Sequence, residues 1–237
     1  MEKIVFTDAK KSVLEEYYPK PASFFVPEWY KEMNSYLTDK KIPSGDGNTS
    51  GTIKRCMPVF DAITAGYIIV LPADVYVTQK QNEVEPDKTY PWFEWPSFDL
   101  VSFHVVEQAP NHPDKNNHLS YPKWINPWGI KTPKGYSTLF TQPVHRKSPF
   151  TIFDGIVDTD TYTAPINFPF VLNDYSFEGL IPAGTPIAQV IPFERQNWQM
   201  KIGNEKDLQE LNKTNARLRT KILDSYKIQF RQRKEYK

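Results

Sequence analysis

The sequence predicts a mainly β fold, and three observations support this prediction. The 237 residues include 21 prolines but only 10 glycines, and aromatic residues make up 14% of the chain. Because proline is excluded from helix interiors and central strands, regular elements between about residues 19 and 195 have to be short. Brief apolar runs bounded by Pro, Gly, Asn or Asp recur in this range, which is typical of a β-barrel or β-sandwich.

Composition and charge exclude several classes of function. Lysine and arginine number 29 against 28 aspartates and glutamates, so no broad field favours nucleic acid or an anionic membrane. The single cysteine, Cys56, excludes an internal disulfide framework and a cysteine-rich zinc site. No apolar run is long enough to span a bilayer, and the first residues lack the apolar core of a signal peptide. We therefore expect a cytoplasmic protein, in a host cytosol or a virion, with no membrane partner and no specific nucleic-acid partner.

The first part of the chain, residues 1–50, predicts an N-terminal cap with a loop. A proline-flanked aromatic stretch with helical spacing from Trp29 to Leu37 predicts a short helix, and a loop rich in Gly, Ser and Asn follows. Residues 51–203 then form the predicted β domain. Its opening strands run through "YIIVLPADVYVTQ", where Pro72 separates two of them.

An aromatic-rich insertion at residues 82–130 interrupts the predicted β domain. It holds four of the six tryptophans, namely Trp92, Trp95, Trp124 and Trp128. Such rings could stack on sugars or bases. Aromatic residues this dense among prolines more often pack a loop layer onto a core or fill a subunit interface, and we favour that interpretation.

The C-terminal part, residues 204–237, contains no Pro or Gly and predicts a basic amphipathic α-helix. Asn204 can cap its start, with Asp207 favourable at the third helical position. Ten basic and five acidic residues give this part a charge of about +5. One stripe is apolar and consists of Leu208, Leu211, Leu218, Ile222, Tyr226 and Phe230. Because this stripe has to be buried on the β domain or on another subunit, we expect a homo-oligomer held partly by the tail.

Four segments of the predicted core carry family motifs. They are "TAGYIIVLPADVYV" at 64–77, "TPKGYSTLF" at 132–140, "GIVDTDTY" at 155–162 and "IPAGTPIAQVIPF" at 181–193. In this order they resemble motifs of the trimeric dUTPases and dCTP deaminases. The whole sequence also resembles a protein family of marine tailed phages of the myovirus type, which implies a phage origin but no activity.

The first resemblance implies a dUTPase-like barrel of β-clip type, often trimeric, and a set of site residues. It implies that Asp158, with Asp160 beside it, orients and deprotonates a water for attack on a nucleotide phosphate bound with Mg²⁺. An arginine and a serine would hold phosphate oxygens, and a tyrosine would pack against the deoxyribose. The nucleotide-binding residues implied in this way are Arg146, Ser148, Tyr162 and Gln189.

This chain departs from the family pattern at several points. Lys147 separates Arg146 from Ser148, Tyr162 lies one residue late, and Ile68 stands where the first motif carries an aspartate. The glycine-rich arm that closes the dUTPase site is absent. These differences favour a non-enzymatic structural or interaction protein on a dUTPase-like scaffold, without a cofactor and with a virion or host protein as a further partner. The alternative is a deoxynucleotide-binding pyrophosphatase that uses Mg²⁺ and Asp158 to activate water.

The residues themselves suggest a simpler role for the aspartate pair. In an extended chain, Asp158 and Asp160 would face the same side about 7 Å apart. Aspartate also stabilises turns by accepting hydrogen bonds from nearby backbone amides. We therefore expect a turn in which one carboxylate binds amides and the other faces solvent or a cation.

Two further groups could carry chemistry. His104, His112, Asp114 and His118 form the only His/Asp cluster, but their context favours a polar loop over an iron site, so no metal is assigned. Arg55 beside Cys56 is a cationic neighbour that could make the thiol more reactive. Without a matching Cys–His arrangement, we expect a buried structural thiol.

Overall fold

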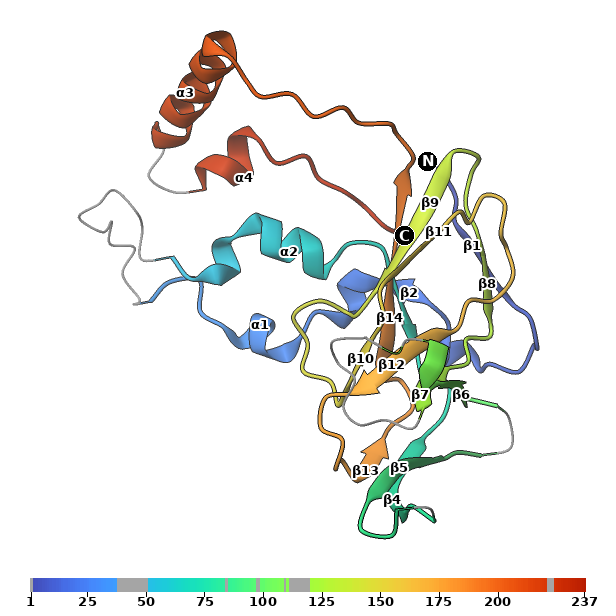
Figure 1. Cartoon of the computed structure of the whole chain (residues 1–237). Helices are drawn as coiled ribbons and strands as arrows, with labels where there is room; N and C mark the ends of the chain where they lie inside the picture. The colour runs from blue at the N-terminus through green and yellow to red at the C-terminus, as the bar shows by residue number, and fades with distance from the viewer. Residues whose placement is uncertain are drawn as a thin grey trace. The chain divides into compact units, whose positions relative to one another are not determined.

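The computed structural model describes residues 2–37, 51–83, 85–96, 99–108, 110, 120–220 and 224–237 (Figure 1). The chain divides into two compact units. Unit 1 comprises Met1–Ala22 and Gly66–Arg195, and unit 2 comprises Ser23–Ala65 and Gln196–Lys237. These divisions differ from the sequence-based boundaries after residues 50 and 203, because the first strand of the chain pairs with a strand of unit 1. The expected Gly/Ser/Asn-rich loop lies almost entirely outside the described residues.

Unit 1 is mainly β, as the sequence predicted. Its strands are β1 (Val5–Asp8), β2 (Lys20–Pro21), β3 (Tyr67–Val70), β4 (Val75–Gln81), β5 (Thr89–Glu94), β6 (Val101–Val105), β7 (Ser120–Trp124), β8 (Trp128–Lys131), β9 (Tyr136–Thr141), β10 (Phe150–Ile152), β11 (Gly155–Val157), β12 (Phe168–Leu172), β13 (Gly179–Ile181) and β14 (Pro186–Glu194). Two 3₁₀ turns, η1 (Glu15–Tyr17) and η4 (Val106–Gln108), accompany them.

These strands form four antiparallel sheets. The sheet orders are β11-β9-β14-β3-β2, β10-β12-β7-β6, β13-β4-β5 and β1-β8. The expected closed barrel is therefore wrong for the described strands. Short strands broken by proline explain the difference, since Pro72 separates β3 from β4 and places them in different sheets.

The five-stranded sheet carries the chain crossings between the units. Ala22 ends the first segment of unit 1 beside Gly66, whose carbonyl accepts a hydrogen bond from the Ala22 amide at 2.9 Å. Gly66 has φ +67°, and a Cβ there would lie 1.9 Å from the Val190 carbonyl oxygen on β14. Only glycine combines this left-handed backbone with such a close approach. The start of β3 at Tyr67 therefore depends on this glycine.

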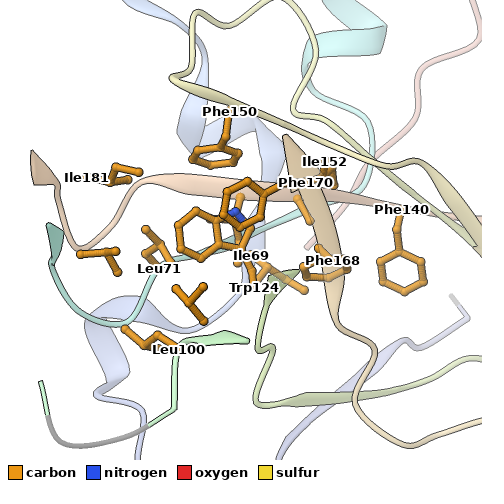
Figure 2. Packing of buried hydrophobic residues seen from close by; sticks show 14 of the residues in the cluster. Ile69, Leu71, Leu100, Trp124, Phe140, Phe150, Ile152, Phe168, Phe170 and Ile181 are labelled. Carbon is orange, nitrogen blue, oxygen red and sulfur yellow. The ribbon is translucent and has the colours of Figure 1, made fainter. Parts of the chain in front are cut away.

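The hydrophobic core of unit 1 is aromatic. Trp124 of β7 is fully buried, and its ring stacks on Phe170 with centroids 4.3 Å apart. Figure 2 shows this pair within the cluster, with Phe150 close to it. Trp128 is also buried. The described part of region 82–130 thus contributes strands β5 to β8 to the sheets, and its last two tryptophans belong to the core.

Unit 2 is helical where it is described. It contains η2 (Ala22–Phe25), α1 (Glu28–Glu32), η3 (Ile53–Arg55), α2 (Met57–Ile63), α3 (Glu205–Arg219) and α4 (Ser225–Gln229). Tyr30 and Ile63 are buried, and Tyr30 stacks with Phe60 at 6.0 Å. Arg231 donates to both carboxylate oxygens of Asp61, which lowers the pKa of Asp61.

The single helix expected over residues 204–237 is wrong. The Asn204 side chain does cap α3 together with Asp207, but α3 ends at Arg219. Asp224, in a left-handed conformation with φ 58°, precedes the separate helix α4. No residue of α3 is buried, and Leu208 and Leu211 are more than half exposed. The described residues of the apolar stripe are therefore not carried by one continuous helix, and Leu208, Leu211 and Tyr226 among them are exposed.

Candidate functional site

The Asp158–Asp160 segment forms a turn at the end of β11. The Asp158 carbonyl accepts hydrogen bonds from the amides of Thr161 at 3.0 Å and Tyr162 at 2.8 Å. Between the two aspartates, Thr159 faces inward and is fully buried. The Asp-Thr-Asp sequence therefore places one hydroxyl inside unit 1 and leaves its two carboxylates for other partners.

The buried hydroxyl of Thr159 belongs to a cluster of three threonines. Its Oγ1 lies 2.8 Å from Oγ1 of Thr132 and 2.7 Å from Oγ1 of Thr138. The Thr132 amide also donates to the Thr159 carbonyl at 3.2 Å. Because a buried hydroxyl is costly without a partner, this cluster holds the turn against the start of β9.

Both carboxylates converge on Arg195, the last residue of unit 1. Asp160 receives Nη1 at 2.8 Å on Oδ1 and Nη2 at 2.5 Å on Oδ2, and its Oδ2 also accepts the Gly135 amide at 2.8 Å. Asp158 Oδ1 lies 3.2 Å from Arg195 Nη1 and accepts the Ser137 hydroxyl at 2.6 Å. We call the set Ser137, Asp158, Asp160 and Arg195 the clasp.

The two aspartates of the clasp differ strongly in how far they are buried and how they pair with Arg195. Its side chain is 3% exposed, whereas that of Asp158 is 61% exposed. The Arg195 hydrogen bonds, followed by that of the Gly135 amide, lower the pKa of Asp160 to about 2. The hydrogen bonds to Asp160 also raise the pKa of the Arg195 guanidinium. A two-point guanidinium–carboxylate pair of this kind fixes geometry and suits an anchor between β9, β11 and β14.

A second group of candidate residues lies at the other end of β9. Gln189 is buried opposite Thr141, and its Oε1 accepts the Val144 amide at 3.1 Å. The glutamine thereby holds the loop that carries Arg146 and Ser148. Since Ser137 of the clasp and Thr141 are four residues apart on β9, the two groups are separated by roughly 13 Å.

Arg146 is the unusual member of this second group. Its Nη2 atom is buried and makes no hydrogen bond to any part of the chain that the structure describes. Burial lowers the pKa of its guanidinium. An unsatisfied cationic nitrogen of this kind is costly, so it is a candidate for binding an anion.

The other residues around Arg146 have structural partners. The Ser148 hydroxyl accepts the Phe150 amide at 3.3 Å, and the Ser148 carbonyl accepts the Asn173 side-chain amide at 2.7 Å. Tyr162 is half exposed in the turn after the clasp. The fold therefore brings Asp158 and Asp160 together, and Gln189 contacts the Arg146 loop through the Val144 amide. The six site residues predicted from the sequence do not lie in one place.

Arg195, Ser137 and Thr159 are not among the site residues predicted from the sequence. Arg195 ends the stretch "IPFER" directly after the Gln189 strand, and an arginine there is a natural counter-charge for an aspartate pair. The register Glu194↔Tyr136 places it beside β9. Without a prediction of which strands pair, nothing in the sequence selects Arg195 from the other arginines.

The remaining candidates give no site within the described residues. His104 lies on β6 with its Nδ1 3.0 Å from Gln108 Oε1, whereas His112, Asp114 and His118 lie outside the described residues. The expectation of a buried Cys56 is wrong, because this thiol is exposed just before α2. Among the described residues there is no cluster of three potential metal ligands, and no helix is long and apolar enough to cross a membrane.

No protein-family model matches the chain, and no curated protein matches it either.

Proposed function

We propose that this protein is a non-enzymatic interaction protein, encoded by a tailed phage, that assembles through unit 2 on a dUTPase-like scaffold. One observation carries the proposal. Among the described residues, the large apolar side chains more than 70% exposed all belong to unit 2: Phe24, Leu37, Trp198, Met200 and Ile202. The most exposed one in unit 1 is Ile156, at 65%.

Such exposure is costly for an isolated chain. Scattered apolar residues are normal on a surface, but three of these five follow each other at alternate positions of one segment. Among the described residues of unit 2, Tyr30 and Ile63 are the only buried hydrophobic ones, so this part offers little core in which to bury them. Assembly with another protein surface would remove this apolar area from water.

The clasp supports a structural role for the aspartate pair. A catalytic Asp158 would have to bind a water and face a metal-bound phosphate. Here its Oδ1 already accepts the Ser137 hydroxyl and lies beside Arg195. The pair therefore acts as an anchor between strands.

Multi-angle light scattering of the intact chain tests this proposal. We expect a mass that is a multiple of the 27.6 kDa chain at micromolar concentration. The resemblance to trimeric families favours three subunits. A chain that stays at the single-subunit mass up to tens of micromolar would overturn self-assembly.

Arg146 supports a second candidate function. Its buried, unpaired Nη2 is suited to a phosphate oxygen, as expected of a deoxynucleotide-binding pyrophosphatase that uses Mg²⁺ and Asp158. Incubation with each deoxynucleoside triphosphate and Mg²⁺, followed by pyrophosphate measurement, separates the two candidates. We expect no release. Release that disappears in Asp158→Asn at unchanged subunit mass would establish the enzyme instead.

A further inference from the structure

We propose that residues 197–202 of one copy dock on the outer face of the β13-β4-β5 sheet of a second copy. We call residues 197–202 the arm and that sheet face the acceptor face. The inference rests on the proposed self-assembly and names its contact surfaces.

The arm has the pattern of a strand without a partner. Trp198, Met200 and Ile202 alternate with Asn197, Gln199 and Lys201, a period of two that puts the apolar residues on one side of an extended chain. Their exposed fractions are 86%, 82% and 80%. Residues 197–202 make no main-chain hydrogen bond to any described part of the chain, and Figure 1 shows a drawn-out segment before α3.

The acceptor face presents exposed apolar side chains on its outer surface. Val75 and Val77 of β4 point into the core, so Tyr76 between them points outward and is 52% exposed. The strand register places Leu180 of β13 on one side of Tyr76 and Glu94 of β5 on the other. Leu180 is 42% exposed.

The acceptor face continues along β4 and β5. Trp92 lies opposite Thr78, two residues from the Tyr76 pair, and Lys80 Nζ lies 3.9 Å above its ring centroid. Rings of this kind are the usual anchors of protein interfaces. Tyr76, Leu180 and Trp92 therefore form an apolar row that could receive alternate side chains of an arm.

The two units carry opposite net charges. Unit 1 has 13 lysines and arginines against 18 aspartates and glutamates, a net charge of −5, whereas unit 2 has 16 against 10, or +6. Segments 74–99 and 174–181, which include the acceptor face, contain eight acidic and two basic residues. The basic part of one copy is thus attracted to the acidic sheet of another.

The occupant has to be a second copy, because the arm cannot reach its own acceptor face. β13 lies near the beginning of β14, whose start at Pro186 is five residues after Ile181. Arg195, fixed by the clasp, lies at the opposite end of β14, roughly 30 Å away. Met200 is only five residues beyond Arg195 and extends at most about 18 Å from it. Arm and acceptor face therefore belong to different chains, and a contact of this head-to-tail type can close into a ring.

Cysteine cross-linking between two full-length proteins tests the contact. In a Cys56→Ser background, one copy carries Met200→Cys and the other carries Tyr76→Cys. Both positions are exposed, so we expect each variant to have the same melting temperature as the Cys56→Ser background protein. The matched control replaces Tyr76→Cys by Ile156→Cys, an exposed apolar position on the edge strand β11.

We expect an interchain disulfide in the Met200→Cys and Tyr76→Cys mixture, at least fivefold more abundant than in the control mixture, because a disulfide requires Cα atoms about 4.4–6.8 Å apart. Equal yields, or a higher yield with Ile156→Cys, would overturn the acceptor face while an oligomeric mass leaves self-assembly standing. A single chain that carries both cysteines serves as a further test. If it forms the disulfide within itself and gives no interchain product, the acceptor face would also be overturned. A single-subunit mass of the background protein would overturn both.

Discussion

At the residue scale, the two aspartates of the clasp differ in solvent exposure and in their hydrogen-bond partners. Asp160 is nearly inaccessible to solvent and has three hydrogen-bond donors, whereas Asp158 is mostly exposed and has Ser137 and Arg195 beside it. Arg195 also donates to the Tyr136 carbonyl at 2.9 Å, so it ties the end of β14 to the start of β9. Arg195, the last residue of unit 1, is therefore held by Asp158, Asp160 and the Tyr136 carbonyl together.

We predict that Asp160→Asn lowers the melting temperature by roughly 5 °C and Asp158→Asn by less than half of that. The amide removes the charge that matches Arg195 and turns one acceptor into a donor facing it. Differential scanning calorimetry measures both. Arg233→Gln, at an exposed arginine outside the clasp, serves as the control and should be nearly neutral. Equal losses at both aspartates would contradict the assignment.

The pKa of Asp160 predicts how this contribution depends on pH. Its folded pKa of about 2 lies below the ordinary value, so the stabilisation is fully present above about pH 4. It is lost as the pH falls from about 4 to about 2. The difference in melting temperature between the wild type and Asp160→Asn should be constant from pH 5 to 8 and shrink below pH 4. A difference that grows on acidification would be the wrong sign.

The candidate site was predictable from the sequence only in part. A turn at Asp158 with an aspartate bound to an amide follows from local chemistry, and the Gly135 amide on Asp160 fits it. The inward Thr159 and the counter-charge Arg195 depend on the pairing of β11, β9 and β14, and Arg195 follows Asp160 by 35 residues in the chain. Such long-range pairing carries no local signal.

At the scale of elements, Gly66 is the position where a strand start depends on one residue. We predict that Gly66→Ala destabilises the fold by more than about 4 kcal/mol, because the Cβ would collide with the β14 backbone and the φ is left-handed. Gly155→Ala is the matched control, since nothing lies within 4 Å of its Cβ position. Urea unfolding measures both. A soluble Gly66→Ala protein with unchanged midpoint would contradict this account of β3.

Helix α3 depends on its cap, because it buries no residue. We predict that Asn204→Ala costs about 1 kcal/mol of helix stability and lowers the helical signal in circular dichroism. Asn212→Ala, within the same helix, removes an asparagine of poor helix propensity and should leave the signal unchanged or slightly higher. Equal effects of the two substitutions would show that the Asn204 hydrogen bonds do not stabilise α3.

Elements with local causes were predicted well, and those with long-range causes were not. The helix start at Asn204 and the break at Pro72 each follow from one residue's backbone preference. Trp124 and Trp128 were expected to pack onto a core or fill an interface, and both are buried. That Trp124 lies on a strand inside a sheet depends on the pairing of β7 with β12 and β6, which carries no local signal. The end of α3 at Arg219 was missed because no Pro or Gly marks it.

At the scale of the whole molecule, the near-neutral net charge is the sum of two units with net charges of opposite sign. The formal charge of +1 is the balance of an acidic unit 1 and a basic unit 2. Attraction between surface charges of this kind is screened within about 8 Å at physiological salt. We predict that raising NaCl from 50 mM to 500 mM shifts the sedimentation profile towards smaller species. Association that strengthens with salt would point to apolar contacts alone.

We propose that apolar residues of unit 2 hold copies of this chain together, and light scattering of one variant is the decisive experiment. The variant replaces all three exposed arm residues, Trp198→Ser, Met200→Ser and Ile202→Ser, in the full-length chain. Because these side chains are at least 80% exposed, the melting temperature of unit 1 should not change. The account predicts a multimer of the 27.6 kDa chain for the wild type and a single subunit for the variant at the same concentration. Equal masses for the two proteins would contradict it.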